Sequence, residues 1–163
     1  MAQIAAVFAA DWNGATYAEP CTRLVLAPNN ARSRLAALIA SAQREVIVQA
    51  MYLTDTGLQE AVTAAAARGI SVRVMLAPES DVPGNGATLA ALRGRQIAVK
   101  VPHDFGLHAK LLVVDDTAFV GSANFSYTSL NKNRELGGFF TEPAAVATLR
   151  TQFMRDWDSG IDP

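Results

Sequence analysis

The chain is poor in cysteine and histidine. Its 163 residues include one cysteine, Cys21, and two histidines, His103 and His108. A single cysteine excludes an intrachain disulfide, and we expect Cys21 to be a small core residue. The spacing of the His, Asp and Glu residues matches none of the usual zinc or EF-hand patterns. We therefore expect neither a metal site nor a bound cofactor.

The chain also lacks an excess of charge of one sign and a long hydrophobic run. Fourteen Lys and Arg residues stand against 15 Asp and Glu residues, for a net charge of −1. This balance argues against a protein that binds nucleic acid mainly through a basic surface. No apolar run approaches the roughly 20 residues that span a membrane. The short apolar stretch in "MAQIAAVFAADW" follows no Lys or Arg, which is unlike a signal peptide. A cytoplasmic or membrane-peripheral location is the expectation.

Half of the residues are hydrophobic and 18% are charged, as in a globular domain of ordinary size. Apolar strand patterns alternate with helical ones along the chain. The predicted strands are 21–28, 45–53, 70–78, 96–102, 108–116, 117–126 and 135–142, and the predicted helices are 29–43, 54–69, 87–95 and 143–157. This order predicts an α/β domain with a mixed, mostly parallel sheet flanked by helices on both faces.

One short pattern occurs near both ends of the chain. "FAADWNG" matches "FMRDWDSG" at Phe, Asp and Trp. Each of these residues precedes its match by the same number of positions in the sequence. The pairs are Phe8 and Phe153, Asp11 and Asp156, and Trp12 and Trp157. Either two amphipathic helices are alike by chance, or residues 1–14 form a helix left from a preceding copy of the domain. Residues 15–163 would then be a single catalytic domain.

The strand predicted at 108–116 begins with polar residues that are costly to bury. His108 and Lys110 are two positions apart, so in a strand they share a face, about 6.6 Å apart along the chain. The next strand ends in "GSAN", Gly121 to Asn124, and Glu135 follows in "NRE". An imidazole, an ammonium, an amide and a carboxylate at one place suit an anionic, electrophilic substrate such as a phosphodiester.

The chemistry of these groups indicates a role for each. A neutral imidazole nitrogen of His108 can attack phosphorus and form a covalent phosphohistidine. A carboxylate bonded to the other ring nitrogen would hold the tautomer. Lys110 and Asn124 can hold the non-bridging oxygens, whose charge must be stabilised in the transition state. A metal site is the rival interpretation, but an ammonium beside His108 would repel a divalent cation.

The pattern His108-x-Lys110-x4-Asp115, followed by Gly121-Ser122-x-Asn124, resembles the phospholipase D superfamily. The segment "AAAARGISVRVMLAP" is similar to the helix and strand that precede this motif in the family, so the resemblance covers roughly residues 24–157. Five residues separate Asp115 from Gly121, where the family usually has six. A tight turn at Asp115 and Asp116 would absorb this difference.

The resemblance implies a phospholipase D-like fold and a metal-independent active site. In that family His108 would be the nucleophile or general acid, and Lys110 and Asn124 would bind phosphate. Ser122 would assist them, and Asp115 would be structural. Glu135 would orient an active-site histidine, in one arrangement across a domain interface.

The mechanism needs a nucleophile and an acid, and one chain carries one copy of the motif, because His103 lacks the surrounding residues. The resemblance implies two facing copies, so the chain either forms a homodimer or is the C-terminal half of a two-motif protein similar to cardiolipin synthases.

The favoured function is a phosphodiesterase or phosphatidyltransferase that acts on phospholipids. One alternative is a homodimeric endonuclease that cleaves DNA or RNA, since compact single-motif members of the family cleave DNA. A second is a non-catalytic half-domain with a binding or assembly role.

Overall fold

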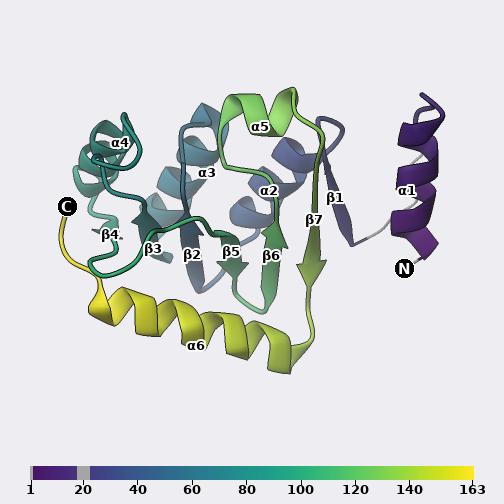
Figure 1. The fold of residues 1–163 in the computed structure, drawn as a ribbon. Coiled ribbons are helices and arrows are strands. Elements are labelled where there is room, and N and C mark those ends of the chain that lie inside the picture. Colours follow the sequence, from purple (N-terminus) through teal and green to yellow (C-terminus); the bar gives the residue numbers. More distant parts are fainter. Residues whose placement is uncertain (1, 18–22) are drawn as a thin grey trace.

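Apolar strand residues assemble into one seven-stranded sheet in the computed structural model, which describes residues 2–17 and 23–163 (Figure 1). The strands lie in the order β1-β7-β6-β5-β2-β3-β4. They are β1 Leu24–Ala27, β2 Glu45–Ala50, β3 Ser71–Leu76, β4 Ala98–Lys100, β5 Lys110–Val114, β6 Thr117–Gly121 and β7 Glu135–Phe140. The helices are α1 Ala2–Trp12, α2 Ala31–Ala40, α3 Thr56–Ala67, α4 Asn85–Arg93, α5 Tyr127–Asn131 and α6 Pro143–Ser159. Cys21 lies outside the described residues.

The mixed sheet is confirmed, but the prediction that it is mostly parallel is wrong. The pairs β2–β3 and β3–β4 are parallel, while β1–β7, β7–β6, β6–β5 and β5–β2 are antiparallel. The connections explain the division. Helices α3 and α4 supply the long crossovers that parallel neighbours require, whereas β5 and β6 are joined by two residues and can only pair antiparallel.

Alternation along the strands creates two apolar layers, one on each face of the sheet. Val46 and Val48 pack in the larger layer, under α2 and α3, while Ile47 points to the other face. There Phe153 of α6 is fully buried in the second layer. Figure 1 shows α6 crossing the face opposite to α2 and α3, so the sheet has helices on both faces as predicted.

Local signals in the sequence account for both ends of α3. The side chain of Asp55 caps α3 by accepting a hydrogen bond from Leu58 N–H at 3.0 Å, and Gly69 beyond its C-terminus has φ +82°. Helix α5 was not predicted, because its five residues carry no apolar period. Among the described residues, no helix is both long enough and apolar enough to cross a membrane.

The terminal helices carry the repeated Phe, Asp and Trp residues in different surroundings. In α6, Phe153 is buried and Asp156 accepts a hydrogen bond from Gln49 at 2.6 Å. In α1, Phe8 and Trp12 are 65% and 80% exposed. Asp11 forms an ion pair with Arg134 at 2.8 Å, which ties α1 to the residue before β7.

Candidate active site

The start of β5, the end of β6 and the start of β7 meet at one edge of the sheet, because these neighbouring strands run antiparallel (Figure 1). Leu111 is opposite Val120, which places Lys110 beside Gly121. The N–H of Ser122 donates to the carbonyl of Leu136 at 2.9 Å and continues this pairing past the end of β6. The topology therefore brings the motif, the GSAN segment and Glu135 to the same edge.

His108 and Lys110 lie side by side at this edge. Strand β5 begins at Lys110 rather than at position 108, so His108 is in the segment just before the strand. The carbonyl of Ala109 still accepts a hydrogen bond from Met51 N–H at 3.1 Å, which anchors that segment to the end of β2. Lys110 Nζ is 3.2 Å from both His108 ring nitrogens and donates to the His108 carbonyl at 2.9 Å. The expectation that both side chains point the same way therefore agrees with the structure.

The environments of these two side chains differ. The His108 side chain is exposed, whereas Lys110 is 8% exposed. Burial lowers the pKa of the Lys110 ammonium below its ordinary value, and the nearby charge of Glu135 opposes that shift. A buried ammonium beside an accessible imidazole is suited to an anion that arrives from solvent.

Glu135 is held by hydroxyl groups from two segments. Its Oε2 accepts a hydrogen bond from Ser122 Oγ at 2.5 Å, and its Oε1 accepts one from Ser129 Oγ at 2.7 Å. Burial alone would raise the pKa of Glu135, but these bonds, one from Asn133 and the charge of Lys110 lower it overall. In the described part of the chain, no hydrogen bond joins Glu135 to His108.

Asn124 is positioned through its backbone. Its N–H donates to Ser129 Oγ at 3.0 Å, while its side-chain Oδ1 is buried and has no hydrogen-bond partner in the described chain. Buried amide oxygens are normally bonded, so this atom is one that a ligand or water would satisfy. No hydrogen bond links Asn124 to His108 or Lys110 within the described residues.

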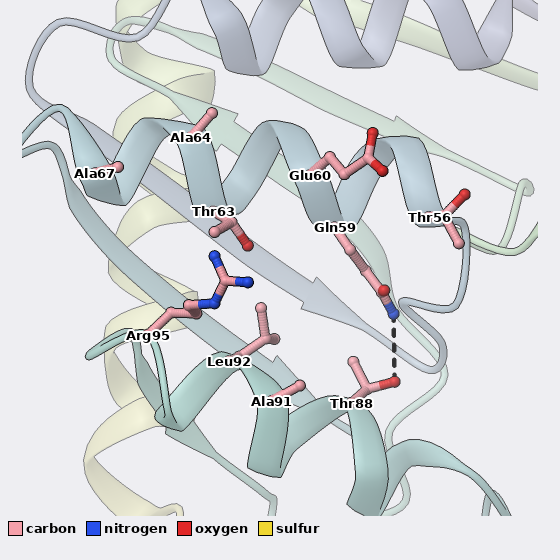
Figure 2. A pocket seen from close by; sticks show the side chains of 10 residues that line it. All are labelled: Thr56, Gln59, Glu60, Thr63, Ala64, Ala67, Thr88, Ala91, Leu92 and Arg95. Carbon is pink, nitrogen blue, oxygen red and sulfur yellow. Dashed lines mark hydrogen bonds between the residues drawn. The ribbon is translucent and has the colours of Figure 1, made fainter.

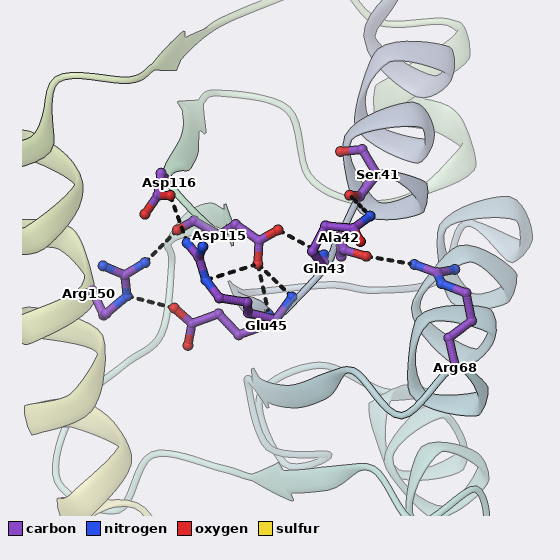
Figure 3. A network of polar contacts seen from close by, with 9 residues as sticks. Ser41, Ala42, Gln43, Glu45, Arg68, Asp115, Asp116 and Arg150 are labelled. Carbon is purple, nitrogen blue, oxygen red and sulfur yellow. Dashed lines mark hydrogen bonds and ion pairs between the residues drawn. The ribbon is translucent and has the colours of Figure 1, made fainter.

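Asp115 follows the last residue of β5, at the end of the strand opposite to Lys110. Figure 3 shows Asp115 beside Gln43 and Glu45. Its carboxylate accepts hydrogen bonds from the N–H groups of Gln43, Arg44 and Glu45 at 2.8, 2.9 and 3.0 Å. Burial would raise the pKa of Asp115, but these three bonds and the charge of Arg44 lower it. Asp115 thus ties the β5–β6 turn to the start of β2 and does not reach the site edge.

The two-residue turn explains the short spacing before GSAN. Val114 pairs with Thr117, so only Asp115 and Asp116 connect β5 to β6, and Asp115 adopts φ +49°. Arg150 of α6 donates to the Asp115 carbonyl at 2.5 Å and to Glu45 Oε1 at 2.7 Å (Figure 3). The tight turn is thereby held by both the sheet and α6.

A cleft of about 480 Å³ opens beside His108. Its lining includes the apolar side chains of Phe105, Leu107, Leu111, Val120 and Leu149. Its polar lining includes Lys110, Gln49, Gln152 and Asp156. Another hollow, of about 520 Å³, lies between α3 and α4 and is lined by residues such as Gln59, Thr63 and Arg95 (Figure 2). None of the predicted site residues lines that second hollow.

His103 lies outside the candidate site, as its lack of surrounding motif residues suggested, whereas Ser129 is an unpredicted member of it. The exposed His103 pairs with Asp104 at 2.5 Å and does not line the His108 cleft. Ser129 was not predicted, although its hydroxyl links Asn124 to Glu135. Its position in a five-residue helix without apolar periodicity gave no signal. In the chain as described, no group of three or more His, Cys, Asp or Glu residues could hold a metal ion.

Known proteins resemble this chain in both sequence and fold. The family described as "Cardiolipin synthase, PLD-like domain" matches residues 35–157. A cardiolipin synthase of Listeria welshimeri is 34% identical over 128 residues, covering 73% of this chain and 26% of that protein. A probable cardiolipin synthase of Bacillus subtilis, YwiE, is 30% identical over 125 residues, covering 73% of this chain and 25% of that protein. The chain thus spans about a quarter of the length of these relatives.

The fold has a solved counterpart. Nuc of Salmonella typhimurium, a phospholipase D family member, superposes with a TM-score of 0.80 at 23% identity, covering 89% of this chain and 99% of that one. This similarity supports the same architecture for the domain. With the family match extending across residues 35–157, the chain belongs to the phospholipase D-like domain family of the cardiolipin synthases.

Proposed function

We propose that this chain carries half of a phosphodiester-cleaving active site, in which His108 is the nucleophile and Lys110 binds the phosphate. The observation that carries the proposal is the contact between the buried Lys110 ammonium and the exposed His108 ring, at 3.2 Å. Phosphate oxygens bound by Lys110 would bring phosphorus next to a ring nitrogen. Proximity of this kind is a large part of catalytic power.

The proposed reaction has two steps. In the first, a ring nitrogen of His108 bonds to phosphorus while the bond from phosphorus to the leaving alcohol breaks, and that alcohol takes a proton from an acid. In the second, water or another alcohol gives its proton to the same group and bonds to phosphorus as the ring nitrogen departs. Lys110 and the Asn124 amide would stabilise the negative non-bridging oxygens in both steps.

Phospholipids are the proposed substrate class. The wall of the cleft beside His108 is rich in aliphatic and aromatic side chains, which suit the apolar part of a lipid better than a nucleic acid backbone. The net charge of −1 points the same way. The relatives with 30% identity or more reported above are named as cardiolipin synthases.

A second copy of the motif is proposed to supply the acid. His103 is exposed and paired with Asp104, and no hydrogen bond in the described chain joins it to His108. The copy would come from a homodimer partner, since twofold contacts place the same face of each subunit together, or from a preceding domain. Each Glu135 could then face the histidine of the other copy.

The terminal helices support a preceding domain as one source of that copy. The stripe of Ile4, Phe8 and Trp12 on α1 has the spacing of Leu149, Phe153 and Trp157 on α6. The α6 stripe packs on its sheet, whereas the α1 stripe is exposed. We propose that α1 is the final helix of such a domain and that its stripe fits a second sheet of this kind.

Headgroup release from phosphatidylglycerol vesicles and cleavage of linear DNA, measured in parallel, would test the proposed function. We expect release by the wild type and by His103→Ala, and none by His108→Ala. EDTA should leave the rate unchanged, because the Lys110 ammonium beside His108 would repel a divalent cation. Full activity of His108→Ala, or loss with EDTA that a divalent ion reverses, would contradict the proposal. DNA cleavage alone would favour the endonuclease alternative, and a dimer inactive in both assays would favour the binding role.

A further inference from the structure

Ser129 occupies a bridging position between two parts of the candidate site. Its side chain is 3% exposed. The hydroxyl donates a hydrogen bond to Glu135 Oε1 at 2.7 Å and accepts one from Asn124 N–H at 3.0 Å. A serine hydroxyl has one proton to donate, so this geometry commits that proton to the carboxylate. One buried hydroxyl thus connects the GSAN segment to the carboxylate at the start of β7.

The other oxygen of Glu135 is bonded from a different direction. Ser122 Oγ donates to Oε2 and accepts a hydrogen bond from Leu136 N–H at 3.1 Å. Two hydroxyls from separate segments therefore determine the position of the carboxylate. If the Ser129 hydroxyl were removed, Glu135 could rotate, and Asn124 N–H would lose its acceptor.

The segment that carries Ser129 is itself fixed. Helix α5 has five residues, too few to be stable alone. Ser126 caps it by accepting a hydrogen bond from Ser129 N–H at 3.3 Å. The carbonyl of Phe125 accepts hydrogen bonds from Thr54 and Asp55 N–H at 2.9 and 3.0 Å, which attach the segment to the start of α3. The Ser129 hydroxyl is consequently presented from a rigid support.

We propose that Ser129 is a positioning residue of the active site, whose hydroxyl holds the Glu135 carboxylate and the Asn124 backbone in the arrangement that serves phosphate binding. The inference rests on the proposed function and extends it to a residue outside the motif. Ser129 acts through its two neighbours and does not touch the substrate.

Loss of the hydroxyl should change the titration of Glu135 in a defined direction. Lys110 of β5 is the charged group that acts on Glu135, and Ser122, Ser129 and Asn133 are its uncharged donors. Burial raises the pKa of Glu135 and its hydrogen bonds lower it, so the pKa rises when one donor is removed. Because the ionised form is the one proposed to work, activity would then disappear at a higher pH on the acid side. We also expect kcat to fall about tenfold, as for loss of one hydrogen bond to a charged group.

The test compares Ser129→Ala and Ser129→Cys with the control Ser126→Ala, which removes the cap of α5 but neither bond of the Ser129 hydroxyl. The Glu135 carboxyl is titrated by carbon-13 NMR in the full-length protein, and kcat and KM are measured against pH on phosphatidylglycerol vesicles. The Cys variant fills the site with a side chain of the same shape and slightly larger volume and has only a weak donor, so it reports on the hydrogen bond even where the cavity left by Ala prevents folding.

We expect a raised Glu135 pKa and a shifted acid limb in both Ser129 variants, with neither change in Ser126→Ala. An unshifted pKa in the Ser129 variants, or an equal shift in Ser126→Ala, would overturn the inference. A wild type that is inactive on vesicles but shows the expected pKa differences would refute the lipid-cleaving function while leaving the role of Ser129 in holding Glu135 intact.

Discussion

At the scale of single residues, the electrostatics of the site centre on Lys110. Burial lowers its pKa, and the neighbouring Glu135 carboxylate raises it. The charged form of Lys110 is therefore maintained partly by another strand. The proposed binding of phosphate by Lys110 requires that charge, so the reaction should lose rate as the pH rises through the pKa of Lys110.

A change at Glu135 should move this basic limb in a known direction. Glu135→Gln removes the group that raises the pKa of Lys110, so that pKa falls further below its ordinary value of 10.5. The alkaline decline of kcat/KM on vesicles should then occur at lower pH than in the wild type. A basic limb at the same pH in both proteins would show that Lys110 does not govern it.

Removal of the ammonium itself should have a larger effect. For Lys110→Met we expect kcat to fall by about 10²–10³, the usual cost of losing one preorganised group that stabilises transition-state charge. Lys132→Met is the control, because Lys132 is exposed and lies over the ring of Tyr127. Equal rates for the two variants would refute the role of Lys110.

Sequence periodicity was informative for His108 and Lys110 and uninformative for Ser129. Two positions on one strand face can be inferred from the spacing alone, and Lys110 Nζ does lie beside the His108 ring. The bond from Ser129 to Glu135 depends on the path of the chain between β6 and β7, which no local pattern encodes.

At the scale of elements, the β5–β6 hairpin has the proposed catalytic residues at one end and a structural carboxylate at the other. Lys110 begins β5 at the site edge, and Asp115 follows its other end, bonded to three N–H groups at the start of β2. Lys110 and Asp115, two polar residues of the same motif, thus lie at opposite ends of β5 and have different partners. Asp115 holds the strand that carries Lys110 in register.

Stability should depend on the charge of Asp115. Its pKa is lowered by folding, so its contribution is complete above the ordinary value of 3.8 and is lost as the pH falls through the lower folded value. Asp115→Asn should reduce the free energy of unfolding at pH 7 by about 1–3 kcal/mol and flatten its decline in acid. Urea unfolding between pH 2 and pH 7 measures both effects.

Asp116→Asn provides the comparison for that experiment. Its side chain is 82% exposed and pairs with Arg44 at the surface, so we expect a change below about 1 kcal/mol. Similar losses in both variants would mean that the turn, and not the carboxylate of Asp115, carries the effect.

The two terminal helices should differ in their contribution to folding. Phe153→Ala empties a fully buried site under α6 and should cost about 3–5 kcal/mol. Phe8→Ala changes an exposed residue of α1 and should alter the free energy of unfolding by about 0.5 kcal/mol or less. Thermal or urea unfolding of both variants checks the pair. A comparable loss at Phe8 would show that its stripe is already packed within this chain.

Strand direction was the least predictable feature of the elements. The apolar runs at 45–53 and 70–78 predicted the strands β2 and β3. An apolar run does not by itself indicate whether the strand beside it in the sheet is parallel or antiparallel. The connections carried that information: the two residues between β5 and β6 require an antiparallel pair, and the helical crossovers α3 and α4 allow parallel ones.

At the scale of the whole molecule, one chain presents one histidine with the motif around it. The proposed reaction needs a second such group, so the active form should contain two copies. Light scattering across a concentration series should give the molar mass of a dimer wherever the chain is active. A chain that cleaves substrate as a monomer at every concentration would contradict this requirement.

The family could be inferred from the sequence because a short motif identifies it. The place where the candidate residues meet could be inferred because they lie on strands that follow one another in the chain and pair antiparallel. The substrate could not, since the cleft beside His108 draws its lining from the 105–107 loop, β5, β6 and α6. These segments meet only in the folded protein.

The central claim, covalent catalysis by His108, is tested most directly by rapid quenching with vesicle substrate followed by mass analysis of the peptides. The account predicts a phosphorus adduct on the peptide that contains His108, present during turnover and absent from His108→Ala. Product formation without an adduct on that peptide, or with an adduct on another residue, would contradict it.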